Sequence, residues 1–293
     1  MSDIQRITDV GGLEPRDRES HKSDFGRVLI VGGSRGMIGA PALSGNAAFR
    51  GGAGLVTLAV PEPVQLTVAS LCCCATSIPL NCDENGDLSA RAAQQIAQAA
   101  EGCDVLAVGP GMGVGVVQEN VIRFALDQSR PVVLDADGLN NLAAISNWPQ
   151  LRNCPLVLTP HPGEFARLTG LDVSTVQAGR ESAAVEAVGK WGGSNCPPPV
   201  CLLKGSGTVV TDATRLYVND TGNPGMAAGG SGDVLTGLIA AFIGGGLSPF
   251  DAACLAARIH GLAGDLAADE LGETSMTAAD IIDYLPAAIR KAG

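Results

Sequence analysis

Apolar and polar residues follow two alternating patterns along the chain. Short apolar runs that end in glycine or polar residues are typical of buried parallel strands. They occur at residues 27–31, 55–60, 104–108, 131–134, 156–159 and 200–204. Apolar residues at helical spacing predict helices at 38–50, 88–100, 174–188, 233–243, 250–268 and 277–288. A hairpin is expected from strands 209–211 and 215–218, and a Gly/Pro-rich surface loop at 192–199.

Strands that alternate with helices predict a mostly parallel sheet, because a parallel crossover needs a connecting segment, usually a helix. The expected fold class is therefore α/β, a three-layer sandwich with helices on both faces of the central sheet. At 293 residues, the chain fits one large domain over 1–293. Residues 1–21 are expected to form a polar lead-in, and the first 25 residues at most one short helix.

Several predicted strands end in glycine together with a polar residue. Ligands of open α/β sheets bind at the carboxyl ends of strands, so a composite site is expected there. The turn at residues 32–36 lacks the G-x-G-x-x-G spacing of dinucleotide-binding folds, which makes that interpretation weak. The strand exits that carry the expected site contain Gly36, Gly113, Asp137, His161 and Lys204.

Residues 223–237 form the stretch around which this site is predicted to assemble. Gly229, Gly230 and Gly232 surround Ser231 just before a predicted helix, so bare N–H groups and the positive end of the helix dipole point to one place. The expected ligand at this place is a phosphate group. Asp233 has two interpretations at this position: a general base that takes a proton from an attacking hydroxyl, or a helix N-cap.

Composition excludes other classes of function. The chain has 46% hydrophobic and 17% charged residues, as expected of a folded globular protein. Its net charge of −11 argues against nucleic-acid binding. The sequence contains no uninterrupted run of 18 apolar residues, so a membrane span is not expected. The nine cysteines contain no C-x-x-C pair, which favours reduced thiols over a zinc site. With no apolar leader, a cytoplasmic location is expected.

Six motifs in one order, at residues 31–40, 109–113, 134–140, 159–164, 203–208 and 223–237, closely resemble those of the ADP-dependent NAD(P)H-hydrate dehydratases. That family has the ribokinase-like fold. The resemblance implies repair of the S-epimer of hydrated NADH or NADPH (NADHX or NADPHX) at the expense of ADP, as in the bacterial type, with AMP and phosphate as the other products.

The resemblance also implies site residues. Asp233 would be catalytic, and the hydrate would contact Ala40, Gly113, His161 and Asp233. The nucleotide would be held by Lys204, Gly205, Ser206, Gly207, Thr208 and Gly232, with an anion hole at Gly229, Gly230 and Gly232. Glu164 would belong to an Mg²⁺ network. Each has a structural alternative: Lys204 as a solvated strand-end lysine, Gly113 as a turn glycine, His161 as an ordinary loop histidine and Glu164 as a helix cap.

Asp135 and Asp137 stay unassigned between supporting Mg²⁺ or Lys204 and satisfying strand-end N–H groups. The resemblance further implies a homotetramer and a separate NAD(P)H-hydrate epimerase as functional partner, since the chain has no room for an epimerase domain. Two alternatives stay open: a small-molecule alcohol kinase of the same fold, such as a vitamin-precursor kinase, and a nucleotide-sensing protein without turnover. NADH against NADPH preference does not follow from the sequence.

Overall fold

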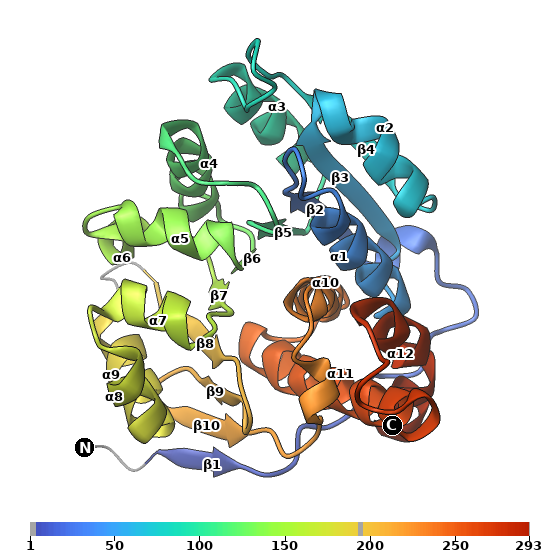
Figure 1. The fold of residues 1–293 in the computed structure, drawn as a ribbon, viewed down its shortest axis with the longest axis vertical. Helices are drawn as coiled ribbons and strands as arrows, with labels where there is room; N and C mark the ends of the chain where they lie inside the picture. The colour runs from blue at the N-terminus through green and yellow to red at the C-terminus, as the bar shows by residue number, and fades with distance from the viewer. Residues whose placement is uncertain (1–3, 193–195, 293) are drawn as a thin grey trace.

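The computed structural model describes residues 4–192 and 196–292, and within them a ten-stranded sheet forms the middle layer (Figure 1). Its strands lie in the order β1-β10-β9-β8-β7-β6-β5-β2-β3-β4. All neighbouring pairs are parallel except those that β9 makes with β8 and β10. In chain order the strands are β1 Gln5–Ile7, β2 Arg27–Val31, β3 Leu55–Pro61, β4 Thr76–Leu80, β5 Val105–Val108, β6 Val132–Leu134, β7 Leu156–Leu158, β8 Val200–Leu203, β9 Val209–Thr211 and β10 Arg215–Val218.

Helices cover both faces of the sheet, which confirms the predicted three-layer α/β architecture (Figure 1). The α-helices are α1 Gly39–Arg50, α2 Glu62–Leu71, α3 Arg91–Ala100, α4 Val116–Leu126, α5 Asp137–Ala144, α6 Trp148–Leu151, α7 Pro162–Thr169, α8 Val173–Ala178, α9 Arg180–Lys190, α10 Ser231–Gly244, α11 Pro249–Leu271 and α12 Ala278–Ala292. Two short 3₁₀ helices are η1 Lys22–Phe25 and η2 Pro224–Met226. Among the described residues, no helix combines the length and apolar character needed to cross a membrane.

Alternate side chains of each strand enter two separate cores. In β2, Val28 and Ile30 belong to the core beneath α1, α10, α11 and α12, whereas Leu29 and Val31 belong to the core beneath α3, α4 and α5. Period-2 alternation in a strand buried on both faces produces this division. The apolar runs read from the sequence are therefore strands with no solvent-facing side.

The chain reverses its winding direction between β2 and β5, which lie side by side although two strands, β3 and β4, separate them in sequence. Such switch points leave a crevice at the carboxyl ends of the strands. The glycine-rich exits of the two strands meet there, since Gly33 donates its N–H to the carbonyl of Pro110 at 2.8 Å. A Cβ on Gly32 would come within 2.4 Å of that same oxygen, so this approach requires glycine.

Four expectations need correction or comment. The lead-in contains strand β1, which pairs with β10 at the sheet edge; a three-residue strand carries no readable periodicity. The helix expected at 174–188 is two helices, α8 and α9, that break at Gly179. Helix α10 begins at Ser231 rather than at residue 233. Part of the loop expected at 192–199 lies outside the described residues, at 193–195.

Candidate active site

Asp233 lies in the first turn of α10, as its third residue. The N-cap is Gly230, whose φ of 95° lies in the left-handed region that favours glycine, and no side chain caps this helix end. The interpretation of Asp233 as the N-cap is therefore wrong. Within the described residues, the N–H groups of Gly229, Gly230 and Gly232 have no internal acceptor, which leaves them free to bind an anion; the anion hole stays a prediction.

Burial raises the pKa of the Asp233 carboxyl to about 7, and the nearby Asp135 adds to the shift while Lys204 opposes it. A carboxylate that titrates near neutral pH can accept a proton in the transition state and is largely available in its basic form. A strongly shifted acid at a helix N-terminus with open N–H groups is typical of a functional site. The side chain therefore has the properties of the predicted general base.

Asp135, directly after β6, connects the ends of β7 and β8 with helix α10 through hydrogen bonds of its carboxylate. Its Oδ1 accepts hydrogen bonds from Lys204 Nζ at 2.6 Å and from Thr159 Oγ1 at 2.8 Å. Its Oδ2 accepts from Thr236 Oγ1 at 2.7 Å, one turn below Asp233 on α10. The carboxylate is only 1% exposed, so three donors are what makes its burial tolerable. Asp135 thus supports Lys204, one of the two roles left open for it.

Lys204 is held in place rather than free in solvent, since its side chain is 20% exposed and also lies 3.9 Å from Glu164 Oε2. Burial alone would lower the pKa of its ammonium group, but Asp135 and Glu164 outweigh that effect and raise it. The interpretation of Lys204 as a solvated strand-end lysine is therefore wrong. A Cβ built on Gly232 would lie 3.1 Å from Lys204 Nζ, so the lysine points at the open end of α10.

Glu164 and His161 together cap α7. The His161 N–H donates to Glu164 Oε2 at 2.8 Å, and His161 Nδ1 accepts from the N–H of Gly163 at 2.9 Å, a reciprocal capping box. Burial raises the pKa of Glu164, against the effect of Lys204. The helix-cap interpretation of Glu164 is confirmed. The His161 ring is exposed, but its Nε2 lies 3.4 Å from Glu164 Oε1, so both ring nitrogens face partners within the protein.

The loop between β5 and α4, residues 109–115, is fixed from the side of α5. Asp137 Oδ2 accepts from the N–H of Gly113 at 2.9 Å, and Asn141 Nδ2 donates to the Gly113 carbonyl at 2.9 Å. Asn141 Oδ1 also accepts from the N–H of Gly115 at 3.1 Å. A Cβ on Gly113 would meet only Gln118, at 3.8 Å, so the glycine presents open backbone on which a ring could lie. Asp137 therefore satisfies a backbone donor, the structural role considered for it.

Ala40 and His260 complete the surroundings. Ala40 is buried at the start of α1, and a Cβ on Gly111 would lie 3.3 Å from its methyl group, which places Ala40 beside the β5–α4 loop. His260 of α11 lies with Nε2 at 3.4 Å from Ser231 Oγ. Burial lowers the pKa of His260 to about 4, so a neutral imidazole packs against the start of α10 at neutral pH.

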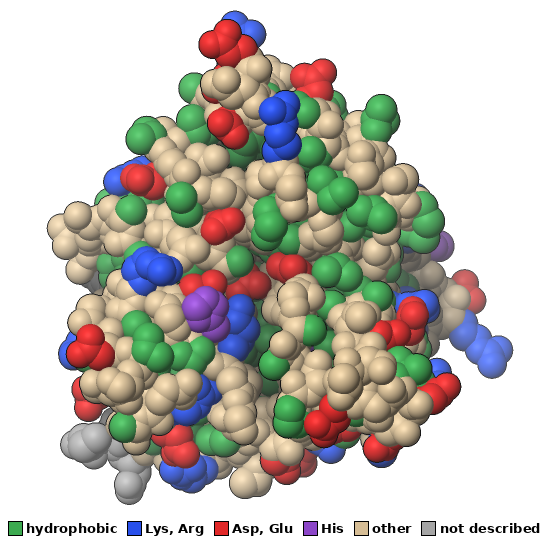
Figure 2. Space-filling view, in the orientation of Figure 1, with side chains coloured by type: hydrophobic (Ala, Val, Ile, Leu, Met, Phe, Trp, Pro, Cys, Tyr) green, Lys and Arg blue, Asp and Glu red, His purple; other side chains and the backbone are tan. Residues whose placement is uncertain are grey.

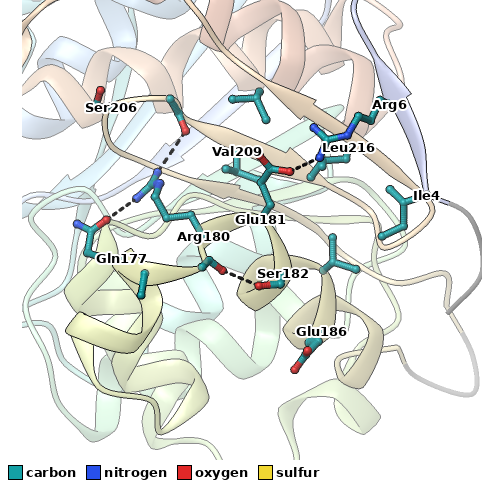
Figure 3. Close-up of a pocket in the computed structure, with 15 residues that line it drawn as sticks. Ile4, Arg6, Gln177, Arg180, Glu181, Ser182, Glu186, Ser206, Val209 and Leu216 are labelled. Atoms are coloured by element: carbon teal, nitrogen blue, oxygen red, sulfur yellow. Dashed lines mark hydrogen bonds and ion pairs between the residues drawn. The ribbon is translucent and has the colours of Figure 1, made fainter.

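The loop between β8 and β9, residues 204–208, borders a cavity of about 520 Å³ through Ser206 and Gly207 (Figure 3). On the face drawn in Figure 2, acidic side chains gather near the centre beside basic side chains and a histidine. Among the described residues, no group of three or more His, Cys, Asp or Glu side chains is arranged to hold a metal ion. The donor set therefore fits Mg²⁺ only where phosphate oxygens and water supply most of the ligands, as Mg²⁺ prefers.

Comparison with known proteins decides the family. A family model described as NAD(P)H-hydrate dehydratase matches residues 28–287. The chain belongs to the NAD(P)H-hydrate dehydratase family. It is 42% identical over 280 residues to a bifunctional NAD(P)H-hydrate repair enzyme of Moorella thermoacetica, covering 95% of this chain and 52% of that protein. The chain thus spans about half the length of the curated relatives it matches.

Solved structures are also similar to this chain. An ADP/ATP-dependent NAD(P)H-hydrate dehydratase of Bacillus subtilis, co-crystallised with ATP and Mg²⁺, superimposes with a TM-score of 0.85 at 30% identity, and both chains are covered completely. A ribokinase-like superfamily protein of Enterococcus faecalis superimposes with a TM-score of 0.81 at 24% identity over 100% of this chain and 98% of its own. The ribokinase-like fold is confirmed.

The residues that the motifs predict for the site come together in space, because those at the exits of β5, β6, β7 and β8 lie around the start of α10. Sequence reasoning missed Thr159, Thr236, Asn141, Arg180 and His260, all of which act on the predicted residues rather than forming motifs of their own. A polar residue in an otherwise apolar strand or helix, such as Thr236 in α10, was the one signal available for some of them.

Proposed function

We propose that this protein dehydrates the S-epimer of NADHX and NADPHX to NADH and NADPH at the expense of ADP, giving AMP and phosphate. One observation carries the proposal: Asp233, with a pKa near 7, lies beside open N–H groups at the start of α10 and above Lys204. The membership of the dehydratase family and the ADP/ATP dependence of the B. subtilis relative support this choice of substrates.

In the first step, Asp233 takes the proton from the ring hydroxyl of the hydrate as that oxygen attacks the β-phosphorus of ADP. The bond between the β-phosphorus and its bridging oxygen breaks, and AMP leaves. The N–H groups of Gly229, Gly230 and Gly232 and the Lys204 ammonium stabilise the charge on the phosphoryl oxygens. Hydroxide, a poor leaving group, is thereby replaced by a phosphate ester.

In the second step, the ring-nitrogen lone pair expels phosphate and restores the ring double bond, with loss of one ring proton. The sum of both steps converts the hydrate and ADP into reduced nicotinamide nucleotide, AMP and inorganic phosphate. Gly113 and Ala40 offer bare, apolar surface for the ring, and the exposed His161 side chain offers a contact surface at the β7 exit.

The acidic surroundings create a need for a cation. Asp135, Glu164 and Asp233 lie around Lys204, and Asp137 is close enough to Asp233 to raise its pKa. These carboxylates repel a diphosphate unless positive charge accompanies it. When bound, Mg²⁺ would neutralise phosphate charge. Glu164, whose Oε2 already caps α7, would hold such an ion through water rather than directly.

The decisive experiment follows reduced-nicotinamide absorbance after mixing purified protein with hydrated NADH, Mg²⁺ and ADP. We expect NADH to form in proportion to AMP and inorganic phosphate, and no NADH to form without a nucleotide. A stable phosphoester in place of inorganic phosphate would identify a plain alcohol kinase. Absence of any turnover, with tight ADP binding, would instead indicate a nucleotide sensor.

We further propose that ADP is preferred over ATP, because a fixed phosphate cradle leaves one phosphorus in line with a hydroxyl near Asp233. If the β-phosphate is that group, ATP places its γ-phosphate in the substrate's space and acts as a weak competitor. Initial rates with ADP and with ATP freed of ADP test this. Equal or faster turnover with ATP would contradict it.

The assembly, location and partner expected from the resemblance are also proposals: a cytoplasmic homotetramer that works with a separate NAD(P)H-hydrate epimerase. Light scattering at dilute concentration measures the oligomer, and a monomer mass would contradict a tetramer. Addition of an epimerase to a mixture of both hydrate epimers should raise the final yield of NADH about twofold, because only one epimer is a substrate.

A further inference from the structure

Arg180, the first residue of α9, lies beneath the β8–β9 loop on the wall of the 520 Å³ cavity (Figure 3). The break between α8 and α9 at Gly179 turns the chain so that the Arg180 side chain points to this loop instead of along one continuous helix. The guanidinium group lies between Gln177 of α8 and the segment that carries Ser206 (Figure 3). The inference drawn here rests on the proposed use of this loop by ADP.

The loop carbonyls are almost all engaged within the protein. Arg180 Nη2 donates to the carbonyl oxygens of Leu203 at 2.9 Å, of Lys204 at 3.2 Å and of Gly207 at 3.5 Å. The Gly205 carbonyl accepts from Thr208 Oγ1 at 2.9 Å. By contrast, no N–H group of residues 205–208 has an acceptor within the part of the chain that the structure describes.

This asymmetry has a geometric cause. In a planar trans peptide the C=O and the next N–H point in opposite directions. When Arg180 binds the carbonyls of Lys204 and Gly207, it turns the N–H groups of Gly205 and Thr208 to the opposite, open side. The Leu203 peptide shows the same relation, because its carbonyl binds Arg180 while the Lys204 N–H donates to Pro160 on the other side.

Gly205 is fitted to this contact. Its φ of 143° is one that L side chains rarely adopt, and a Cβ there would lie 2.9 Å from Arg180 Nη1. The glycine therefore permits both the peptide orientation and the close approach of the guanidinium. A larger residue at position 205 would meet the guanidinium group.

Arg180 also brings positive charge that no acid cancels. Among the described residues, no carboxylate forms an ion pair with Arg180, whereas Lys204 is paired with Asp135 and lies near Glu164. Burial lowers the pKa of Arg180, yet a guanidinium stays protonated in proteins. A half-buried cation under a row of open N–H groups makes the upper side of the loop attractive to an anion.

We propose that Arg180 is a positioning residue of the nucleotide site: it fixes the β8–β9 loop from below so that the N–H groups of residues 205–208 face the diphosphate of ADP. It does not touch the nucleotide and takes no part in proton transfer. Its loss should therefore weaken nucleotide binding and leave the hydrate side of the site unchanged.

The test compares Arg180→Gln with Arg6→Gln. Arg6 lines the same cavity, but it pairs with Glu181 and makes no contact with the loop. Titration calorimetry with ADP and Mg²⁺, without hydrate, should show at least a tenfold rise in Kd for Arg180→Gln, as expected on loss of charge-assisted hydrogen bonds. Arg6→Gln should match the wild type. Arg180→Lys should recover part of the affinity, because lysine restores the charge and one donor but not the fork.

Hydrogen exchange separates failure of this inference from failure of the proposed function. In Arg180→Gln the amides of residues 205–208 should exchange faster without any nucleotide, and ADP should protect them less than in the wild type. Should wild-type protein not bind ADP, the proposed function fails, while faster exchange in the variant still supports loop fixation. If a variant with wild-type Tm keeps both ADP affinity and exchange rates, the positioning role is overturned; Arg180→Lys replaces Arg180→Gln if the latter does not fold.

Discussion

The β5–α4 loop and the β8–β9 loop are both glycine-rich strand exits. Carbonyls are held by side chains in both loops, so the loops differ in whether their N–H groups are also used within the protein. In the β5–α4 loop, N–H groups are engaged: those of Gly113 and Gly115 donate to Asp137 and Asn141. In the β8–β9 loop only carbonyls of residues 205–208 and their neighbours are engaged, by Arg180 and Thr208, and the N–H groups of residues 205–208 have no acceptor among the described residues.

The difference separates two kinds of recognition that share one sequence signature. A loop whose N–H groups are used internally offers shape and apolar surface, which suits an uncharged ring. A loop whose carbonyls are used internally offers donors, which suits a phosphate. Glycine content alone does not distinguish the two. The chemistry of the anchoring side chain does: a carboxylate and an amide for one, a guanidinium for the other.

The largest effect is expected at Asp233, which both loops flank. Asp233→Asn removes the base while keeping the shape, so turnover should fall by roughly 10² or more. The Kd for ADP should stay nearly unchanged, because neither loop loses an anchor. Rapid-quench measurement of AMP formation together with ADP calorimetry checks both statements, and wild-type turnover would remove Asp233 from the mechanism.

Asn141→Leu sharpens the comparison from the substrate side. Leucine leaves the Gly113 carbonyl and the Gly115 N–H without partners, so the β5–α4 loop should lose its fixed shape. We expect kcat/KM for the hydrate to fall by about tenfold or more with no change in the Kd for ADP. Arg180→Gln should instead raise the Kd for ADP and leave the hydrate side of the site unchanged.

The matched control for that variant is Asn46→Leu, because Asn46 binds the Leu71 carbonyl on the far side of α1 and contacts neither loop. Steady-state kinetics at saturating ADP measure kcat/KM for the hydrate without a contribution from ADP binding. The comparison breaks down if Asn141→Leu weakens ADP binding as much as hydrate turnover, since the two loops would then form one unit.

Asp135→Asn tests the electrostatic link between the two loops. The negative charge of Asp135 raises the pKa of Asp233, so its removal should lower that pKa. Because Asp233 acts as a base, wild-type kcat/KM should rise with pH through about 7. In the variant this acidic limb should move to lower pH, by about one unit. A limb that stays in place would mean that another group titrates.

The smallest effect concerns stability. Asp233 has its folded-state pKa raised to about 7 from 3.8, so its ionisation opposes folding as the pH rises between those values. Above pH 7, Asp233→Asn should therefore raise the free energy of unfolding by on the order of 1 kcal/mol or more, and raise the Tm with it. Near pH 4 the substitution should have little effect. Thermal unfolding at both pH values measures this, and an equal change at the two would point to packing rather than charge.

The sequence predicted the layers, most strands and the motif residues, because period-2 and helical apolar patterns are local. Helices α2, α4, α5 and α6 and strands β1 and β4 were not predicted. Each is 11 residues or shorter, and so few positions leave the local pattern ambiguous between helix, strand and loop. Asp233, Lys204 and Gly113 were found because their motifs are contiguous. Arg180 and Asn141 were not, because their partners lie 23 or more residues away and only the tertiary fold brings them together.

The buried carboxylate of Asp135 also has a consequence for synthesis of the chain. Its partners, Thr159, Lys204 and Thr236, lie 24, 69 and 101 residues further along. A ribosome delivers them in that order, so the carboxylate cannot be desolvated with all its donors until α10 has emerged. Until then the Asp135 carboxylate at the end of β6 stays hydrated. Packing of the C-terminal helices therefore completes the fold and the site in the same step.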